Sequence, residues 1–119
     1  MTPDAAIFQF FNGFMQAFPV TAVPDDAQLP WMTYDYTEGR FGDNASSITV
    51  NMWFRTTSEA LPNQKAREFR DYIEEHGLIR CDGGLIWVKP GNPWSQVIAE
   101  EDNSIKRRYI NLEIEYITR

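Results

Sequence analysis

His76 and Cys81 are the side chains of this sequence that could form a nucleophilic pair, because a neighbouring imidazole can take the proton of a thiol. They are the single histidine and the single cysteine of the 119 residues. The end of a helix and the start of the following strand would bring them close in space. No third orienting group and no oxyanion-hole motif accompanies them. The simpler interpretation of His76 is a capping or half-buried side chain, so a Cys–His enzyme is the least supported function.

Two clusters of carboxylates, at residues 25–26 and 100–102, could serve general acid–base chemistry or bind a metal ion. Neither has the ligand spacing of a calcium loop, and adjacent side chains on an extended chain point apart. Gly83-Gly84 lacks the helix and the lysine that complete a phosphate-binding loop, and Cys81 alone cannot complete a cysteine-based zinc site. The sequence therefore predicts no catalytic residue, no metal site and no cofactor, and a protein that is not an enzyme.

The chain is acidic, with 17 acidic and 11 basic residues and a net charge of −6. Coating nucleic acid requires a basic surface that releases counterions, so this role is disfavoured. An acidic surface is compatible with DNA that slides past without adhering. No apolar run approaches the length of about 18 residues that crosses a bilayer, and the first residues lack the pattern of a secretory signal. We therefore expect no membrane partner and a cytoplasmic origin.

An acidic group of residues is expected near the end of the second helix. Asp71, Glu74 and Glu75 lie in the last turns, where the helix macrodipole disfavours negative charge. Pairing with Arg67 and Arg70 at i,i+4 spacing is one explanation of this arrangement. The other is that a partner favours the acidic end.

Lys106, Arg107 and Arg108 form the one basic run of the sequence, at the beginning of the last expected strand. Strand alternation places Arg107 on one face and its two neighbours on the other. Two interpretations stay open. The charges could protect an edge strand or a solvated strand end from unwanted pairing, or they could meet the acidic group of a neighbouring copy, where complementary charge fixes register.

Aromatic residues are the unusual feature of the composition, since four Trp, five Tyr and eight Phe make up 14% of the chain. Aromatic residues beyond the need of a small core usually lie in interfaces. The apolar stripe of the first helix includes Phe10 and Phe14 and is wider than one packing face requires. Either this helix is wedged deeply into its own domain, or one edge of the stripe meets a partner. Trp31, Trp53 and Trp87 suggest, as an alternative function, a groove for a ligand or peptide.

Capping residues and apolar periodicity predict two helices. Thr2 as N-cap and Pro3 at the first position begin a helix that should run to about Phe18. A second helix should start after Ser58 or at Pro62 and end at Gly77, with its apolar face formed by Ala66, Phe69, Ile73 and His76.

Alternating patterns predict strands at residues 31–38, 46–56, 78–81, 85–89 and 105–118. The segment from Gly39 to Ala45 should be a flexible turn that exposes Arg40 and Phe41. Asp82-Gly83-Gly84 indicates a tight hairpin, Gly91-Asn92-Pro93-Trp94 should break the sheet, and residues 95–103 should form an irregular or short helical excursion.

The resulting order, α-β-β-α-β-β-β, is typical of the α+β class. We expect an antiparallel sheet of about five strands with the two main helices packed on one face. The length and the absence of an internal repeat predict a single domain over residues 1–119.

Six segments of the sequence resemble, in this order, segments of a known family. They are Val23-Pro24-Asp25-Asp26-Ala27, Leu29-Pro30-Trp31-Met32-Thr33-Tyr34, Trp53-Phe54-Arg55, Cys81-Asp82-Gly83-Gly84, Gly91-Asn92-Pro93-Trp94 and Arg107-Arg108-Tyr109-Ile110-Asn111-Leu112. On these segments, which span most of the chain, the sequence resembles the small tail terminator, or minor tail, proteins encoded by long-tailed phages and prophages of bacteria.

The resemblance implies an α+β subunit that forms a ring, commonly of six, on the head-proximal end of the tail tube. Such a ring stops polymerisation of the tube and offers a docking surface to the head connector. The implied partners are other copies of the chain, the tail tube protein, the head–tail connector protein, and DNA that passes through the lumen without specific binding. The implied location is the virion tail, assembled in the host cytoplasm, and the family carries no catalytic residues.

Ring contacts are heterologous and closed, so they require two different patches on each subunit. The residues expected to supply them are Phe10, Phe14, Arg40, Phe41, Asp71, Glu74, Glu75, Lys106, Arg107 and Arg108. Another phage neck or minor tail component, and the ligand-binding module with a tryptophan-lined groove, remain the alternatives.

Overall fold

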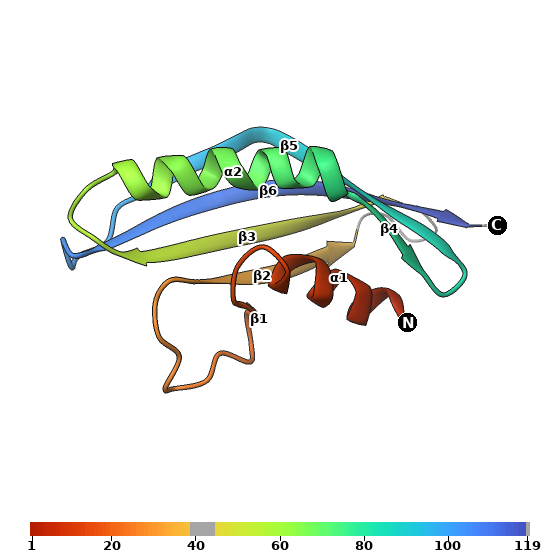
Figure 1. Ribbon diagram of the computed structural model, residues 1–119, viewed down its shortest axis with the longest axis horizontal. Helices are drawn as coiled ribbons and strands as arrows, with labels where there is room; N and C mark the ends of the chain where they lie inside the picture. The colour runs from red at the N-terminus through yellow and green to blue at the C-terminus, as the bar shows by residue number, and fades with distance from the viewer. Residues whose placement is uncertain (39–44, 119) are drawn as a thin grey trace.

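The computed structural model describes residues 1–38 and 45–118 of the chain. Within these ranges two helices cover one face of a six-stranded sheet (Figure 1). The elements are α1 (Pro3–Asn12), β1 (Ala17–Pro19), β2 (Trp31–Glu38), β3 (Ala45–Arg55), α2 (Ala60–His76), β4 (Leu78–Cys81), β5 (Gly84–Ile98) and β6 (Ile105–Thr118). The strand order is β1-β2-β3-β6-β5-β4, so β1 and β4 form the two edges.

The α+β class and the two main helices are confirmed, but the strand count and order of the prediction are wrong. The described residues form six strands rather than about five, because β1 adds an edge strand. β1 pairs in parallel with β2, whereas every other neighbouring pair is antiparallel. The element order is therefore α-β-β-β-α-β-β-β.

The first helix begins as predicted and ends six residues early, at Asn12 instead of about Phe18. The Thr2 hydroxyl accepts a hydrogen bond from the Ala5 backbone N–H at 3.2 Å, as an N-cap does. At the other end the Asn12 side chain accepts the N–H of Ala17 at 3.3 Å. This bond turns the chain into β1, so the residues predicted as the last turns of the helix leave the helix axis.

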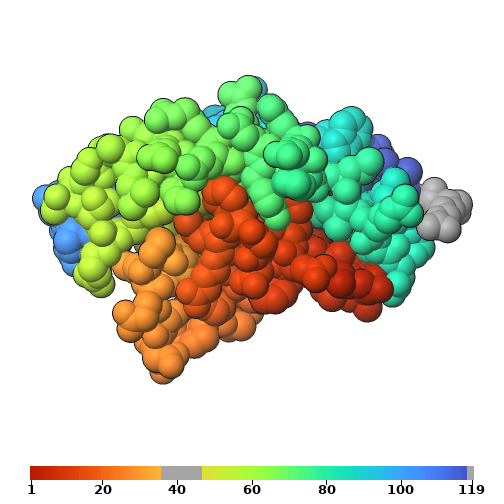
Figure 2. All heavy atoms as spheres, in the orientation of Figure 1, coloured from red at the N-terminus to blue at the C-terminus, as the bar shows by residue number. Residues whose placement is uncertain are grey.

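The core lies between the helices and the sheet and follows the alternation of the strands. The inward positions of β3 and β6 are almost completely buried: Ile48, Val50, Met52, Phe54, Ile110, Leu112 and Ile114. From the helices, Phe11 of α1 and Phe69 of α2 complete the same cluster. In the space-filling view α1 and α2 lie side by side over this face (Figure 2). The period-two patterns in the sequence therefore predicted the buried side of the sheet correctly.

The second helix agrees with its predicted bounds but not with every predicted face residue. Ala66, Phe69 and Ile73 are buried as expected. His76 was placed on the same face, and its side chain is instead exposed, with its ring 5.0 Å from that of Tyr72.

The hairpin predicted at Asp82-Gly83-Gly84 is present, with Gly83 at a φ of 86° that favours glycine. Residues 91–94 do not end the strand, so the predicted break of the sheet there is wrong. It is a bulge between Pro90 and Ser95, after which β5 continues to Ile98. The predicted excursion over residues 95–103 is therefore partly strand. β6 is long enough to pair with β5 on both sides of the bulge, a non-local reason that the local Gly and Pro signals do not contain.

Candidate interaction surface

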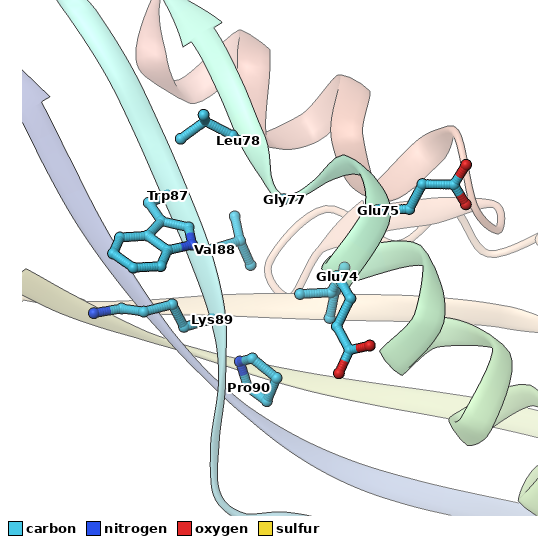
Figure 3. Close-up of a pocket in the computed structure, with 9 residues that line it drawn as sticks. Glu74, Glu75, Gly77, Leu78, Trp87, Val88, Lys89 and Pro90 are labelled. Carbon is cyan, nitrogen blue, oxygen red and sulfur yellow. The ribbon is translucent and has the colours of Figure 1, made fainter.

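A surface hollow of about 330 Å³ lies where the last turn of α2 meets β4 and β5. We call it the α2–β4 groove, and its most prominent lining residues are Glu74, Glu75, Leu78, Trp87 and Lys89 (Figure 3). It forms because the chain passes directly from the helix into the edge strand. The Val88 N–H donates to the Gly77 carbonyl at 2.7 Å, which fixes the helix end against β5.

Gly77 is required at this junction because a side chain would collide with the backbone. A Cβ atom at this position would lie 2.3 Å from the Ile73 carbonyl oxygen and 2.8 Å from that of Val88. Both are backbone atoms that cannot rotate away. The close approach of the helix end to β5, and with it the shape of the groove, therefore depends on glycine.

The groove has an apolar part that faces solvent. Leu78 lies directly opposite Trp87 in the β4–β5 ladder, and the two residues are 60% and 45% exposed. Lys89 covers one side of the indole ring, with its ammonium 4.7 Å from the ring centroid, and also donates to Glu115 at 3.3 Å. The Lys89 charge is thus balanced within the chain, while much of the Leu78 and Trp87 surface remains uncovered.

The acidic rim of the groove comes from α2. In Figure 3 the Glu74 carboxylate points toward Pro90, and Glu75 points away from the strand. Arg70 lies 3.5 Å from Glu74, which confirms one of the two predicted i,i+4 pairs, but both side chains are about 60% exposed. Such solvated pairs contribute little. Asp71, Glu74 and Glu75 are all exposed, as residues of an interface must be before assembly.

The basic run is mostly engaged inside the subunit. β6 lies between β3 and β5, so the edge-strand interpretation of residues 106–108 is wrong. Arg108 is 2% exposed; its guanidinium donates to the Glu59 carboxylate and, at 2.8 Å, to the Asn63 side chain. Lys106 lies 3.8 Å from the same carboxylate. Arg108 therefore does not present its charge to a partner in this structure.

Arg107 faces the opposite side of the sheet, as alternation predicted. It donates to the Asn51 side chain at 2.8 Å, pairs with Glu100 at 3.4 Å, and lies 5.2 Å over the Trp53 ring. These contacts leave it about one-quarter exposed. Its positive charge serves first to hold β6 to its neighbours.

Burial and hydrogen bonding shift the pKa of two groups next to these contacts. The hydrogen bond from Arg108 lowers the pKa of Glu59 below its ordinary value, and the charges of Arg108 and Lys106 act in the same direction. Burial raises the pKa of Tyr72, whose hydroxyl donates to the Phe10 carbonyl at 2.7 Å. Both groups tie helices to the rest of the fold, and Glu59 also lines a surface hollow of about 200 Å³ with Glu100 and Arg107.

Phe10 and Phe14 also pack inside the subunit. Phe10 is buried, with its ring 4.9 Å from Tyr72. The Phe14 ring lies 4.9 Å from Phe69 and 5.3 Å from Tyr72, and the Lys65 ammonium lies 5.8 Å above it. These contacts with α2 account for Phe10 and Phe14 and agree with the wedged-helix interpretation, whereas Phe8 of the predicted stripe is exposed.

The three tryptophans do not line one groove. Trp31 and Trp53 are cross-strand neighbours with ring centroids 4.8 Å apart. Along β6, Trp53 is paired with Arg107 and Trp87 with Glu115, so about eight residues, or roughly 26 Å, separate the two sites. The alternative of a tryptophan-lined binding groove is therefore wrong in that form.

His76 and Cys81 do not share a site in the described part of the chain. His76 is exposed beside Glu75, whereas Cys81 is partly buried against the core. A hollow of about 200 Å³ between the β4–β5 turn and β6 includes Cys81 but not His76. Within residues 1–38 and 45–118, no three His, Cys, Asp or Glu side chains are placed to hold a metal ion.

Arg40 and Phe41 lie outside the described residues. Conversely, the structure adds Leu78 and Ile117 to the exposed apolar surface at the same end of the sheet, and neither was expected there. The position of Leu78 opposite Trp87 could have been predicted from the sequence, because a turn at Asp82-Gly83 fixes the register of the β4–β5 hairpin.

Over the described ranges, no helix has the length and apolar character needed to span a membrane.

Comparison with known proteins gives a match in structure and none in sequence. No known family and no curated protein matches the chain. Among solved structures, a chain of the "Virion of native gene transfer agent (GTA) particle" superposes with a TM-score of 0.70 at 10% sequence identity. The match covers 97% of this chain and 94% of that chain. The whole arrangement of helices and strands, rather than a fragment of it, is therefore a fold that also occurs in a protein of that virion.

Proposed function

We propose that this chain is a non-catalytic structural component of a phage or phage-like particle. The observation that carries the proposal is the end-to-end fold likeness to a chain of a gene transfer agent virion. The absence of a shared His–Cys site and of a metal cluster in the described residues is compatible with a protein that works by contact. The exposed Leu78–Trp87 pair beside acidic residues supplies a surface for such contact.

Within the particle, the proposed role is that of a tail terminator. Copies of the chain would form a ring, of six by analogy with the family it resembles, at the head-proximal end of the tail tube in the virion tail. The ring would stop tube growth and present a docking surface to the head connector, after assembly in the cytoplasm of a bacterial host. The ordered sequence segments support this role, and the fold likeness is compatible with it.

The shape and charge of the subunit suit a closed ring. The sheet has two different edges, β1 and β4, as heterologous contacts require. The net charge of −6 suits a lumen through which DNA passes, because like charge keeps the duplex from adhering.

Immunogold electron microscopy of particles from the cell that encodes the chain tests this role. Antibodies against the full chain are expected to label the junction between head and tail. Label at the distal tip or on the head surface would contradict the terminator role and favour another virion component. Particles without label would contradict any role in the virion.

A further inference from the structure

The two edges of the sheet differ in how many of their backbone groups are free. The Val20 N–H donates to a carbonyl of β2 at 3.0 Å, so alternation turns Ala17 and Pro19 of β1 away from β2. The Ala17 N–H donates to the Asn12 side chain at 3.3 Å, and Pro19 has no N–H. The Pro19 carbonyl accepts the Ala22 N–H at 2.9 Å. The β1 edge is therefore largely closed to a further strand.

The edge of β4 is open. The Val88 N–H donates to the Gly77 carbonyl at 2.7 Å, and residue pairs that exchange hydrogen bonds alternate along an antiparallel ladder. The backbone groups of Leu78 and Arg80 therefore point away from β5. Within the part of the chain that the structure describes, these groups make no hydrogen bond, and both residues are exposed.

The next outward position of this edge, Asp82, already carries a main-chain partner. Its N–H donates to the Met1 carbonyl at 2.8 Å, and the Met1 ammonium lies 2.7 Å from its carboxylate. In Figure 1 the N-terminus accordingly lies close to the β4–β5 hairpin. Met1 thus pairs with this edge as a residue of a neighbouring strand does. The adjoining positions, Leu78 and Arg80, are left for a longer segment.

The side chains of these two positions specify the chemistry of such a segment. Leu78 is 60% exposed, and Arg80 forms no ion pair with any described residue. In antiparallel pairing, a segment with an apolar residue opposite Leu78 places the residue two positions earlier opposite Arg80. Opposite charges stabilise such a cross-strand pair. The matching segment therefore reads acidic residue, any residue, apolar residue.

A second β4 strand does not have this pattern. The antiparallel register that pairs both outward residues of two copies sets each Arg80 opposite Leu78, and the register centred on Arg80 sets two arginines opposite each other. The closed edge of β1 does not accept β4 either. The segment that matches this edge therefore comes from a different protein.

We propose that β4 receives an extended segment of another protein of the particle as a seventh, antiparallel strand, with an acidic residue opposite Arg80 and an apolar residue opposite Leu78. Main-chain hydrogen bonds supply the affinity of this contact, and the two side chains supply its selectivity. The proposal rests on the virion role proposed above, which provides the other protein. It uses the edge of β4 and not the acidic side chains at the end of α2.

A synthetic peptide, acetyl-Thr-Glu-Thr-Val-Thr-amide with a fluorescein label, tests the backbone pairing with the full chain. Fluorescence anisotropy should show saturable binding. N-methylation of the Glu and Val amides, whose N–H groups face β4, should weaken binding at least about tenfold, the effect of one lost hydrogen bond. N-methylation of the central Thr amide, whose N–H faces away, should leave it unchanged. A peptide that does not saturate, or equal affinity of the two methylated peptides, would overturn the proposal.

Arg80→Pro tests the same bond from the protein side. It removes an outward N–H that the β4–β5 ladder does not use, so binding should weaken at least about tenfold in a chain whose urea unfolding shows that it remains folded. Arg80→Ala is the matched control, because it keeps the N–H and should weaken binding only about twofold to fivefold through the lost charge pair. Equal affinities of the two variants would contradict strand addition. If the proline variant does not fold, the methylated peptides decide.

Charge exchange tests the selectivity. Arg80→Glu should weaken binding of the peptide and strengthen binding of a second peptide that has Lys in place of Glu. The same order of affinities in the variant and in the original chain would overturn the assigned register. Particle labelling is independent of these results: label at the head–tail junction with failed peptide binding would remove the strand contact and leave the proposed function, whereas peptide binding with unlabelled particles would do the reverse.

Discussion

Leu78 faces Trp87 across the β4–β5 ladder with more than two-fifths of each residue exposed to solvent. Replacement of Leu78 by Lys should leave the free energy of unfolding within about 0.5 kcal/mol, because the side chain is already mostly in water. The same change should weaken self-association, since it places a charge on the apolar part of the groove. Urea unfolding and sedimentation of one sample separate the two effects. A Leu78→Lys chain that loses stability and association together would show that Leu78 is part of the core.

Arg108 should be important for stability rather than for assembly. Arg108→Ala removes a buried guanidinium and its bonds to Glu59 and Asn63. Because Glu59 is half exposed and can regain water, we expect a loss of about 2–3 kcal/mol, below the roughly 3–5 kcal/mol of a pair buried on both sides. The control is Arg67→Ala on the exposed face of α2, with an expected change below about 0.5 kcal/mol. Equal losses in the two variants would contradict the assigned role of Arg108.

The contact between Arg108 and Glu59 also predicts a pH dependence. The pKa of Glu59 is lowered in the folded chain from an ordinary value of 4.5, chiefly by the hydrogen bond from Arg108. Its contribution to stability is therefore complete above the ordinary value and is lost as pH falls through the lower, folded value. Glu59→Gln should make the loss of stability below about pH 4.5 less steep in urea unfolding. In an Arg108→Ala background the same substitution should have no such effect, and a persistent effect would assign the dependence to another contact.

Phe14 should likewise contribute to folding and not to a partner surface. Its ring packs on Phe69 and Tyr72, so Phe14→Ala should lower the free energy of unfolding by roughly 1–3 kcal/mol. Phe8→Ala, on the exposed side of α1, should change it much less. Thermal and urea unfolding give both values. If Phe14→Ala weakens self-association without a loss of stability, Phe14 belongs to the interface and not to the core.

Sequence patterns predicted the elements that depend on local chemistry. The N-cap of α1 at Thr2, the period-two core of β3 and β6 and the turn at Gly83 each depend on a few adjacent residues. The early end of α1 depends on β1 pairing with β2, and the continuation of β5 past Pro90 depends on β6. Both are long-range pairings, which local propensity does not report.

The candidate surface was predicted less well than the fold, for the same reason. Neither open interpretation of the basic run included the burial of Arg108, because its partners Glu59 and Asn63 are more than 40 residues away in the chain. Glu74 and Glu75 are exposed, which is compatible with both explanations of the acidic helix end. The apolar half of the groove was missed, although the register of the hairpin at Asp82-Gly83 places Leu78 opposite Trp87.

Native mass spectrometry of the purified full chain over a range of concentrations tests the central claim most directly, namely that the protein works by assembling with copies of itself into a closed ring. The account predicts one defined species of more than two 13.8 kDa subunits, which dissociates without a stable two-fold dimer. A chain that remains a monomer, or stops at a dimer, at every concentration would contradict it.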